Sequence, residues 1–351
     1  MRFPRVARAG RVLSVTLALL LCVTALAGCK PKPPPNTLIA FLLGGEASTR
    51  WAEGYQPALD KRVTQTCRGC STLFLDAGGD ANLQAEQFDQ AISQGADVIV
   101  INAVDSERAE ELVLAAGKVP VIAFDRYVAG ADYYVGYDAV VTGQLQADAV
   151  LAAAEGGSPS VLLIDGGRGD ANTAAVRQGR EQELSGKAQI LGELQPEGGS
   201  AQEAATWAKE QLRKHKPDSV DAILAANDMQ AGAVVDVLTD LGVKPQQFPD
   251  VTGQDADLTA VRRIVRGEQE MTVYKPIAPE ADQAADVAVT LVTGGKVSGG
   301  QPVEGVPSFI FTPQAVTQNN LADTVVKDRL YTLEQICDAE TLKSCQRLGL
   351  R

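Results

Sequence analysis

The chain has 351 residues, a formal net charge of −12 at pH 7 and a hydrophobic fraction of 45%. An acidic surface repels nucleic acid, so we expect no nucleic-acid partner, and this apolar fraction over this length predicts two folded domains rather than disorder. His215 is the only histidine. Ser-His-Asp hydrolases, Cys-His proteases and most zinc enzymes use histidine as a base or a ligand, so we expect neither such an activity nor a metal or other cofactor.

The first 28 residues have the features of an export signal. Four arginines precede an apolar run at residues 12–27, and the triplet Leu26-Ala27-Gly28 stands directly before Cys29. This run is shorter than the roughly 20 residues of a membrane-spanning helix, and a basic stretch, a short apolar stretch and small residues together are typical of a cleaved signal. The Ala-Gly-Cys sequence resembles the lipobox of bacterial lipoproteins, whose cysteine becomes lipidated. An uncleaved signal anchor is the alternative.

Residues 29–36 are predicted to be a lipidated cysteine followed by a tether. The sequence KPKPPP follows Cys29, and Pro-rich segments are extended spacers that build no core. Removal of the four arginines in the signal lowers the net charge from −12 to −16. We therefore expect an acidic domain that is anchored to a membrane through lipid and faces the periplasm or the extracellular side.

Short apolar segments alternate with helical patterns from residue 37 onward. The expected strands cover residues 37–43, 72–76, 97–104, 120–124, 160–165, 190–194, 222–226, 251–253 and 271–274. The expected helices cover residues 49–63, 107–117, 171–184, 202–214, 229–241 and 258–266, and Asp80 and Gly95 can bound one more. Repeated β–α units predict an α/β fold of parallel sheets with helices on both faces. A boundary near Asp138 separates two doubly wound lobes, whose strand ends would enclose a ligand cleft.

Four cysteines remain after the signal and the lipidation site, namely Cys67, Cys70, Cys337 and Cys345. An even number in an exported domain suggests disulfides, and four cysteines allow three pairings. We predict the local pairs Cys67–Cys70 and Cys337–Cys345. A thioredoxin-like redox motif at Cys67 is a weaker alternative, because such a motif opens a helix after a strand and this one follows a helix. A four-cysteine zinc site is weak as well, because the two pairs lie far apart in the sequence.

Charged and amide side chains follow the apolar strands of both lobes. They are Arg50, Asp125, Arg126, Asn172, Asn227, Asp255 and Lys275. A sugar hydroxyl both donates and accepts hydrogen bonds, so planar Asp, Asn and Arg groups can hold it from two sides, and Trp51 offers an apolar face to a sugar ring. Any one of the charged or amide residues could instead be a solvated loop residue. Trp51 could instead be a helix residue that packs on the core. We expect Asp228 and Asp257 to be helix caps.

A resemblance to a known family rests on four short stretches. They are residues 253–258 (GQDADL), 271–277 (MTVYKPI), 123–126 (AFDR) and 306–308 (VPS). With these stretches, residues 37–333 resemble the periplasmic sugar-binding proteins of ABC importers, in particular their xylose-binding group and its relatives among multiple-sugar receptors. The resemblance is far more specific than the β–α alternation alone.

The resemblance implies a ligand set and a division of the chain. The residues that match the family's ligand-holding positions are Arg50, Trp51, Asp125, Arg126, Asn172, Asn227, Asp255 and Lys275. The N-terminal lobe would comprise residues 37–138 plus 277–307, and the C-terminal lobe residues 139–276 plus 308–351, joined by a three-strand hinge. The crossings would lie near Asp138, Pro276 and Pro307, and helix 279–292 would return to the first lobe. The tail beyond Asp328 is an addition to the family pattern.

Two departures from the family pattern concern the choice of sugar. The family's second lobe presents a tryptophan after its second strand, whereas residues 192–199 contain no aromatic side chain. Relatives often have Asp-Asn at the first crossing, where this chain has Asp138-Ala139. These departures leave open whether the ligand is a xylose-like aldopentose, a related aldose or a larger sugar.

The sequence therefore predicts a lipid-anchored, monomeric binding protein of a carbohydrate ABC importer. Two lobes would close on one monosaccharide and present it to a membrane permease. A sugar receptor for chemotaxis or for a histidine kinase is the alternative, since it would need the same site. A LacI-type repressor would need a basic helix-turn-helix where this chain has a lipobox. A glycosidase would need a carboxylic acid as proton donor, and Arg126 and Lys275 are expected to keep Asp125 and Asp255 ionised.

Overall fold

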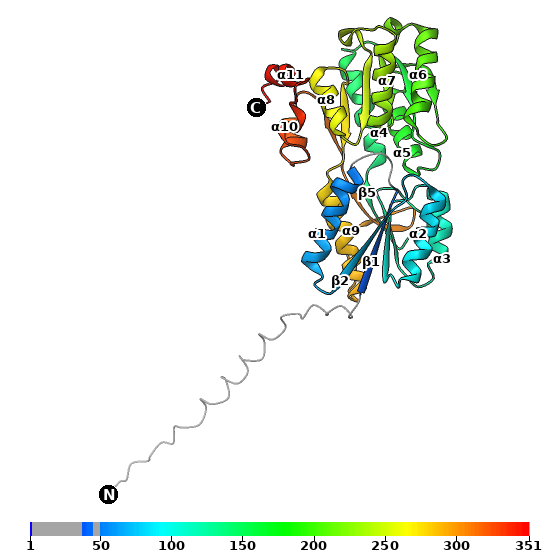
Figure 1. Cartoon of the computed structure of the whole chain (residues 1–351), viewed down its shortest axis with the longest axis vertical. Helices are drawn as coiled ribbons and strands as arrows, with labels where there is room; N and C mark the ends of the chain where they lie inside the picture. Colours follow the sequence, from blue (N-terminus) through cyan, green and yellow to red (C-terminus); the bar gives the residue numbers. More distant parts are fainter. Residues whose placement is uncertain (2–36, 45–49, 351) are drawn as a thin grey trace. The chain divides into compact units, whose positions relative to one another are not determined.

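The computed structural model describes Met1, residues 37–44 and residues 50–350. The predicted signal, Cys29 and the Pro-rich tether lie outside these residues. The described chain forms two α/β lobes, each built on one mostly parallel sheet (Figure 1). No helix among the described residues has the length and apolar character that a membrane span requires.

The first lobe contains a seven-stranded sheet with the order β11-β12-β5-β4-β3-β1-β2. Its strands are β1 (Thr37–Leu43), β2 (Cys70–Asp76), β3 (Val98–Ile101), β4 (Val121–Phe124), β5 (Tyr133–Tyr137), β11 (Gln301–Val303) and β12 (Val306–Phe311). All neighbours pair in parallel except β11, which is antiparallel to β12. Helices α1 (Gln56–Thr66) and α9 (Ile277–Val292) cover one face, and α2 (Ala81–Ser93) and α3 (Ser106–Ala115) cover the other (Figure 1).

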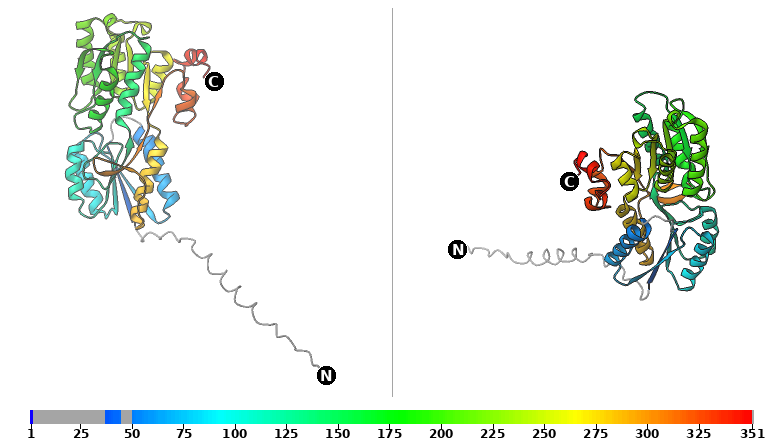
Figure 2. Two further views of the ribbon diagram at one scale, coloured as in Figure 1. Left: turned by 180° about the vertical axis from the view of Figure 1, so that it is seen from behind. Right: turned by 45° about the horizontal axis from the view of Figure 1, so that its top comes forward.

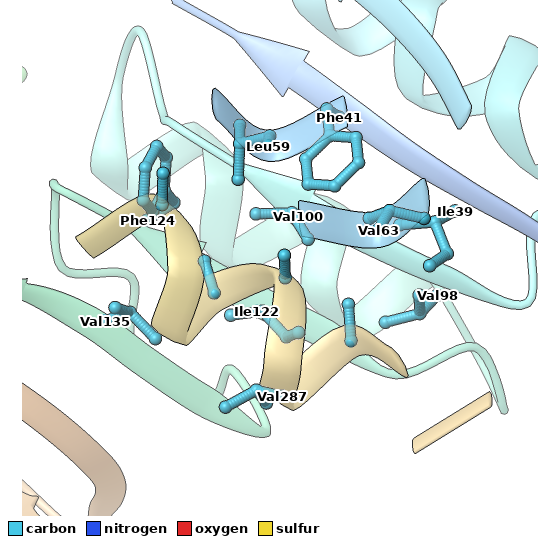
Figure 3. Close-up of a cluster of buried hydrophobic side chains, with 14 of the residues drawn as sticks. Ile39, Phe41, Leu59, Val63, Val98, Val100, Ile122, Phe124, Val135 and Val287 are labelled. Carbon is cyan, nitrogen blue, oxygen red and sulfur yellow. The ribbon is translucent and has the colours of Figure 1, made fainter. Parts of the chain in front are cut away.

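Strand β1 explains why this sheet needs helices on both faces. Ile39 and Phe41 pack into the core beneath α1 and α9, whereas Ala40 and Leu42 pack into the core beneath α2 and α3. Figure 3 shows the first of these cores, where Phe41 lies beside Leu59 of α1. Because successive side chains of a strand point to opposite faces, a strand that is buried on both sides must be apolar throughout.

The second lobe contains a six-stranded sheet with the order β13-β10-β9-β8-β6-β7. Its strands are β6 (Ser160–Ile164), β7 (Gln189–Leu194), β8 (Ala222–Ala225), β9 (Asp250–Gln254), β10 (Met271–Tyr274) and the antiparallel β13 (Gln314–Val316). Its main helices are α4 (Ala139–Ala153), α5 (Asn172–Leu184), α6 (Ala201–His215), α7 (Asp228–Asp240) and α8 (Leu258–Arg266). Helices α6 and α7 pack on one face of the sheet, and α4 and α5 pack together on the other.

The chain passes between the two sheets three times. The first passage follows β5 at Asp138 and the second follows β10 at Lys275 and Pro276. The third was predicted near Pro307, and this position is wrong. Strand β12 pairs in parallel with β5 in the first sheet, so the passage follows Phe311 and precedes β13. Proline near the beginning of a strand is compatible with a sheet, so Pro307 does not end the lobe as the sequence suggested.

The C-terminal tail packs against the second lobe. Helices α10 (Leu333–Ile336) and α11 (Leu342–Arg347) lie beside α8, where Ile336 and Cys345 are buried in one cluster with Ile264 (Figures 1 and 2). Arg262 of α8 also forms an ion pair with Asp338 of the tail at 3.1 Å. The tail beyond Asp328, whose position could not be predicted from the sequence, therefore belongs to the second lobe.

Both local disulfides are present. Cys337 and Cys345 join the two short helices of the tail, with their Cα atoms 5.9 Å apart. Cys67 and Cys70 join the end of α1 to the beginning of β2, with their Cα atoms 5.4 Å apart. Cys70 pairs with Thr37 at the amino end of the sheet, so this disulfide lies at the opposite end of the strands from the cleft described below.

Helices α4 and α5 are in contact through their backbones at two glycines. A Cβ atom on Gly143 would lie 1.9 Å from the carbonyl oxygen of Val176, and one on Gly179 would lie 2.0 Å from that of Val140. Real Cβ atoms do not approach a carbonyl oxygen this closely, so any side chain at these positions would force the two helices apart.

Replacing Gly143 with alanine is therefore expected to lower the free energy of unfolding by about 1–3 kcal/mol. This is opposite in sign to the gain of about 1 kcal/mol that the same replacement brings in an exposed helix interior. Chemical denaturation measures the difference. Gly198→Ala is the control, because its Cβ would meet nothing within 4 Å. A Gly143→Ala variant as stable as the wild type would contradict the close packing of α4 on α5.

Candidate ligand-binding cleft

A cavity of about 300 Å³ lies at the carboxyl ends of both sheets and is lined by residues of the two lobes. The eight residues predicted to hold a ligand all line it, namely Arg50, Trp51, Asp125, Arg126, Asn172, Asn227, Asp255 and Lys275. These eight side chains bring together three cations, two carboxylates, two amides and one aromatic ring. A concave site with converging polar groups from two domains is the common form of a small-molecule site.

In each lobe, one aspartate faces the cleft from the end of a strand and has the same backbone conformation. Asp125 follows β4 with a φ of 60°, and Asp255 follows β9 with a φ of 101°. Their backbone N–H groups donate to the carbonyl oxygens of Val135 and Val273 in the next strand, each at 2.8 Å. Non-glycine residues rarely adopt positive φ, and such residues are concentrated at ligand sites. The left-handed turn ends each strand while the backbone hydrogen bond keeps the aspartate at the edge of the sheet.

Lys275 connects the two aspartates. Its ammonium lies 3.0 Å from Asp125 Oδ1 and 3.4 Å from Asp255 Oδ1. Burial alone raises the pKa of Asp125, but Lys275 and Arg50 outweigh it, so the pKa lies below its ordinary value. Burial likewise lowers the pKa of Lys275, and the two carboxylates more than offset this and raise it. Asp125 and Lys275 are therefore both charged at neutral pH, so Asp125 accepts hydrogen bonds and cannot serve as a proton donor.

Arg50 reaches from the first lobe to the hinge and to the second lobe. It belongs to a single π-helical turn, η1 (Arg50–Tyr55), which replaces the first part of the predicted helix 49–63. Its guanidinium donates to the carbonyl oxygen of Lys275 and, at 3.3 Å, to that of Asp255. Trp51 follows in the same turn, stacks on Tyr55 at 4.9 Å and is 8% exposed. Trp51 is therefore both a core residue and part of the cavity wall.

Further contacts join the lobes across the cleft. Arg126 Nε of the first lobe lies 3.1 Å from Asp170 Oδ2 of the second. Asn172 Nδ2 donates to the carbonyl oxygen of Asp125 at 2.8 Å, and the N–H of Ser106 donates to Gly169 at 2.8 Å. These direct bonds between lobes indicate a closed arrangement of the cleft.

The expected helix caps are only partly present. Asn227, not Asp228, caps α7, and its Oδ1 accepts from the backbone N–H three residues on. Asp228 is fully buried, and its carboxylate accepts from Thr272, from Gln269 and from the backbone N–H of Asp257, each at 2.9 Å. The expectation for Asp228 is wrong because a buried carboxylate needs several donors, and here the neighbouring strand and loop supply them. Asp257 stands at the N-cap position of α8, but its side chain makes no capping hydrogen bond to that helix.

Asp165 and Asp170 also line the cavity, although neither was selected from the sequence as a ligand-binding residue. Asp165 follows β6 and forms ion pairs with Arg177 and Arg180 of α5, the latter at 3.2 Å. Its position after an apolar strand is the same signal that singled out Asp125, so it could have been found. Asp170 lies in a loop and pairs with Arg126 of the other lobe. No local sequence pattern connects two such positions.

The wall without an aromatic residue consists mainly of backbone. Glu197, Gly198 and Gly199 line the cavity where the family pattern places a tryptophan. A Cβ on Gly199 would lie 2.9 Å from the backbone nitrogen of Gly167, so this loop packs directly on the loop after β6. Glu197 also pairs with Arg168 of that loop at 3.1 Å, in an exposed position.

Two α/β lobes, three connecting segments and a polar cleft between them define a two-lobed ligand-binding protein. Comparison with known proteins agrees. The periplasmic binding protein domain family matches residues 39–296. The D-xylose-binding periplasmic proteins of Haemophilus influenzae and Escherichia coli are 34% and 32% identical to this chain, covering 76% and 74% of it and 83% and 81% of those proteins.

A solved structure has the same fold. The carbohydrate transporter solute-binding protein of Chloroflexus aurantiacus, in complex with D-glucose, has a TM-score of 0.75 at 23% identity, covering 86% of this chain and 98% of that one. The chain belongs to the periplasmic binding protein family. It is therefore a binding protein rather than an enzyme, in agreement with the charged state of Asp125.

Proposed function

We propose that this protein binds a monosaccharide in its cleft and delivers it to an ABC importer in the membrane. The observation that carries the proposal is the ion-paired chain Asp125–Lys275–Asp255, which connects the two lobes through the hinge residue. Charged partners of this kind form the strongest hydrogen bonds to hydroxyl groups. Because the ligand would contact both lobes, it would favour the closed over the open arrangement.

The size and charge of the cleft favour one neutral sugar ring. The cavity volume of about 300 Å³ lies at the lower end of the range of about 300–1,000 Å³ for small-molecule sites. The cations Lys275 and Arg126 are paired with Asp125, Asp255 and Asp170, so an anionic ligand would have to compete with these carboxylates for the two cations. A xylose-like aldopentose or a related aldose fits these conditions, and the names of the two D-xylose-binding relatives support this class.

The same proposal includes a lipid anchor and a location outside the cytoplasmic membrane. The lipobox resemblance at Cys29 and the family's periplasmic members support both. The permease partner is supported by the importer role that the family resemblance implies.

Thermal unfolding with a panel of pentoses, hexoses and disaccharides tests the binding function. A ligand present at a hundred times its dissociation constant adds about 2.7 kcal/mol to the free energy of unfolding, which shifts the melting temperature by several degrees. We expect one or a few aldoses to produce this shift. A panel in which no sugar shifts the melting temperature would contradict the proposal.

Asp255→Ala is expected to weaken the binding of the responding sugar by about ten- to a hundred-fold, since a lost charged hydrogen-bond partner costs about 1.5–3 kcal/mol. Calorimetric titration measures the change. Asp240→Ala, at an exposed position of α7, is the matched control and should leave the dissociation constant unchanged. An Asp255→Ala variant that binds the sugar as tightly as the wild type would contradict the assignment of Asp255 to the binding site.

A further inference from the structure

Two fully buried polar residues lie behind the cleft without lining it. Tyr55 ends the π-helical turn η1, and Glu280 lies in the first turn of α9, and both side chains are 0% exposed. The Tyr55 hydroxyl donates to Glu280 Oε2. Glu280 Oε1 is buried and has no hydrogen-bond partner among the described residues. Burying a carboxyl group costs free energy, so its place here calls for a function in the local structure.

The two residues continue directly from Arg50. The Arg50 guanidinium donates to the Tyr55 hydroxyl at 2.8 Å and lies over the Tyr55 ring, 4.9 Å from its centroid. A π-helix bonds residues five apart, so Arg50 and Tyr55 lie on the same face of η1. In an α-helix of 3.6 residues per turn they would point in different directions. Gly54 keeps η1 tight against α9, because a Cβ there would lie 2.4 Å from Ile277 Cδ1.

We propose that Tyr55 and Glu280 are positioning residues that hold the Arg50 guanidinium in the cleft from behind. The inference rests on the proposed function, in which Arg50 binds the sugar. The ring and hydroxyl of Tyr55 restrain the guanidinium on the first-lobe side, while the carbonyl oxygens of Lys275 and Asp255 restrain it on the other. Glu280 in turn fixes the direction of the Tyr55 hydroxyl.

The charges around this support are already balanced without Glu280. Arg50 and Lys275 match the carboxylates of Asp125 and Asp255 in the same buried region. Burial, with Asp125 nearby, raises the pKa of Glu280 to about 8. A mainly protonated Glu280 at pH 7 is closely matched in shape and charge by glutamine, whose amide oxygen can still accept from Tyr55.

The test is a double-mutant cycle in the purified protein, read by calorimetric titration with the sugar that stabilises the wild type. Tyr55→Phe is expected to weaken binding by about ten-fold, the effect of one lost hydrogen bond to a charged group. In an Arg50→Met background the same substitution should have no further effect, because Tyr55 acts through Arg50. Glu280→Gln should bind as the wild type does, whereas Glu280→Leu should weaken binding as Tyr55→Phe does. Tyr133→Phe, another tyrosine of the first lobe, is the matched control.

The outcomes separate this inference from the proposed function. Equal effects of Tyr55→Phe with and without Arg50, or no effect in the wild type, would overturn the positioning role while leaving sugar binding intact. If no sugar binds the wild type, the proposed function fails. The free energies of unfolding of the same variants are then measured by chemical denaturation without ligand. Non-additive stabilities of Tyr55→Phe and Arg50→Met would still support the coupling of the two residues, and additive stabilities would overturn it.

Discussion

Replacing Lys275 with methionine is expected to weaken sugar binding by at least about a hundred-fold, which corresponds to about 2.7 kcal/mol, and to lower the free energy of unfolding by about 3–5 kcal/mol at pH 7. The ammonium lies within 3.4 Å of Asp125 and Asp255, and Asp125 is only 6% exposed. Without Lys275, the buried carboxylate loses the partner that contributes most to its low pKa. Calorimetric titration and chemical denaturation measure the two effects.

Two comparisons isolate the cause of this loss. Lys187→Met removes an ammonium that lies 3.2 Å from Glu183, but this lysine side chain is 55% exposed, so the expected change in stability is below about 0.5 kcal/mol. The loss in Lys275→Met should also shrink as the pH falls, because Asp125 takes up a proton at a higher pH in the variant than in the wild type, where Lys275 lowers its pKa. Equal effects of the two lysine substitutions would contradict the central role of Lys275.

Glu280→Gln is expected to gain stability relative to the wild type as the pH rises from 5 to 8. Burial raises the pKa of Glu280 from 4.5 to about 8 in the folded protein. Between these values the folded state holds a proton that the unfolded state has lost, so the wild-type free energy of unfolding falls with rising pH. At 1.36 kcal/mol per pH unit, the fall amounts to at most about 5 kcal/mol. Glutamine does not titrate, so the free energy of unfolding of the variant does not include this fall.

Chemical denaturation of both proteins at pH 5 and at pH 8 measures this effect. The difference between variant and wild type should increase by a few kcal/mol between the two pH values. Glu86→Gln, an exposed carboxyl of α2, should stay within about 0.5 kcal/mol of the wild type at both. A Glu280→Gln difference that does not depend on pH would contradict a protonated Glu280 in the folded protein.

The α/β architecture could be predicted from the sequence because buried parallel strands are continuous apolar runs. Strand β1 and strand β3 are of this kind, and helices such as α6 alternate with them. Helix α4 was not predicted, because it packs against both the sheet and α5 and its sequence is apolar on most sides, without a helical periodicity. Residues 308–311 of strand β12 were assigned to the wrong lobe because a strand's pairing partner is set by contacts far away in the sequence.

The cleft could be predicted to a similar extent and for a related reason. Strand ends of parallel sheets gather at one edge, so residues such as Asp125 and Asp255 were expected to lie together, and they do. Glu280 and Tyr55 gave no such signal. They are 225 positions apart, and their contact exists only because a π-helical turn meets the helix that returns from the hinge.

Isothermal titration of the purified protein with D-xylose and the other aldoses of the panel tests the central claim most directly. We expect saturable binding of one sugar per chain, lost on Lys275→Met and retained on Lys187→Met. Absence of binding by any sugar, or binding that survives the loss of Lys275 undiminished, would contradict a sugar site built on Asp125, Lys275 and Asp255.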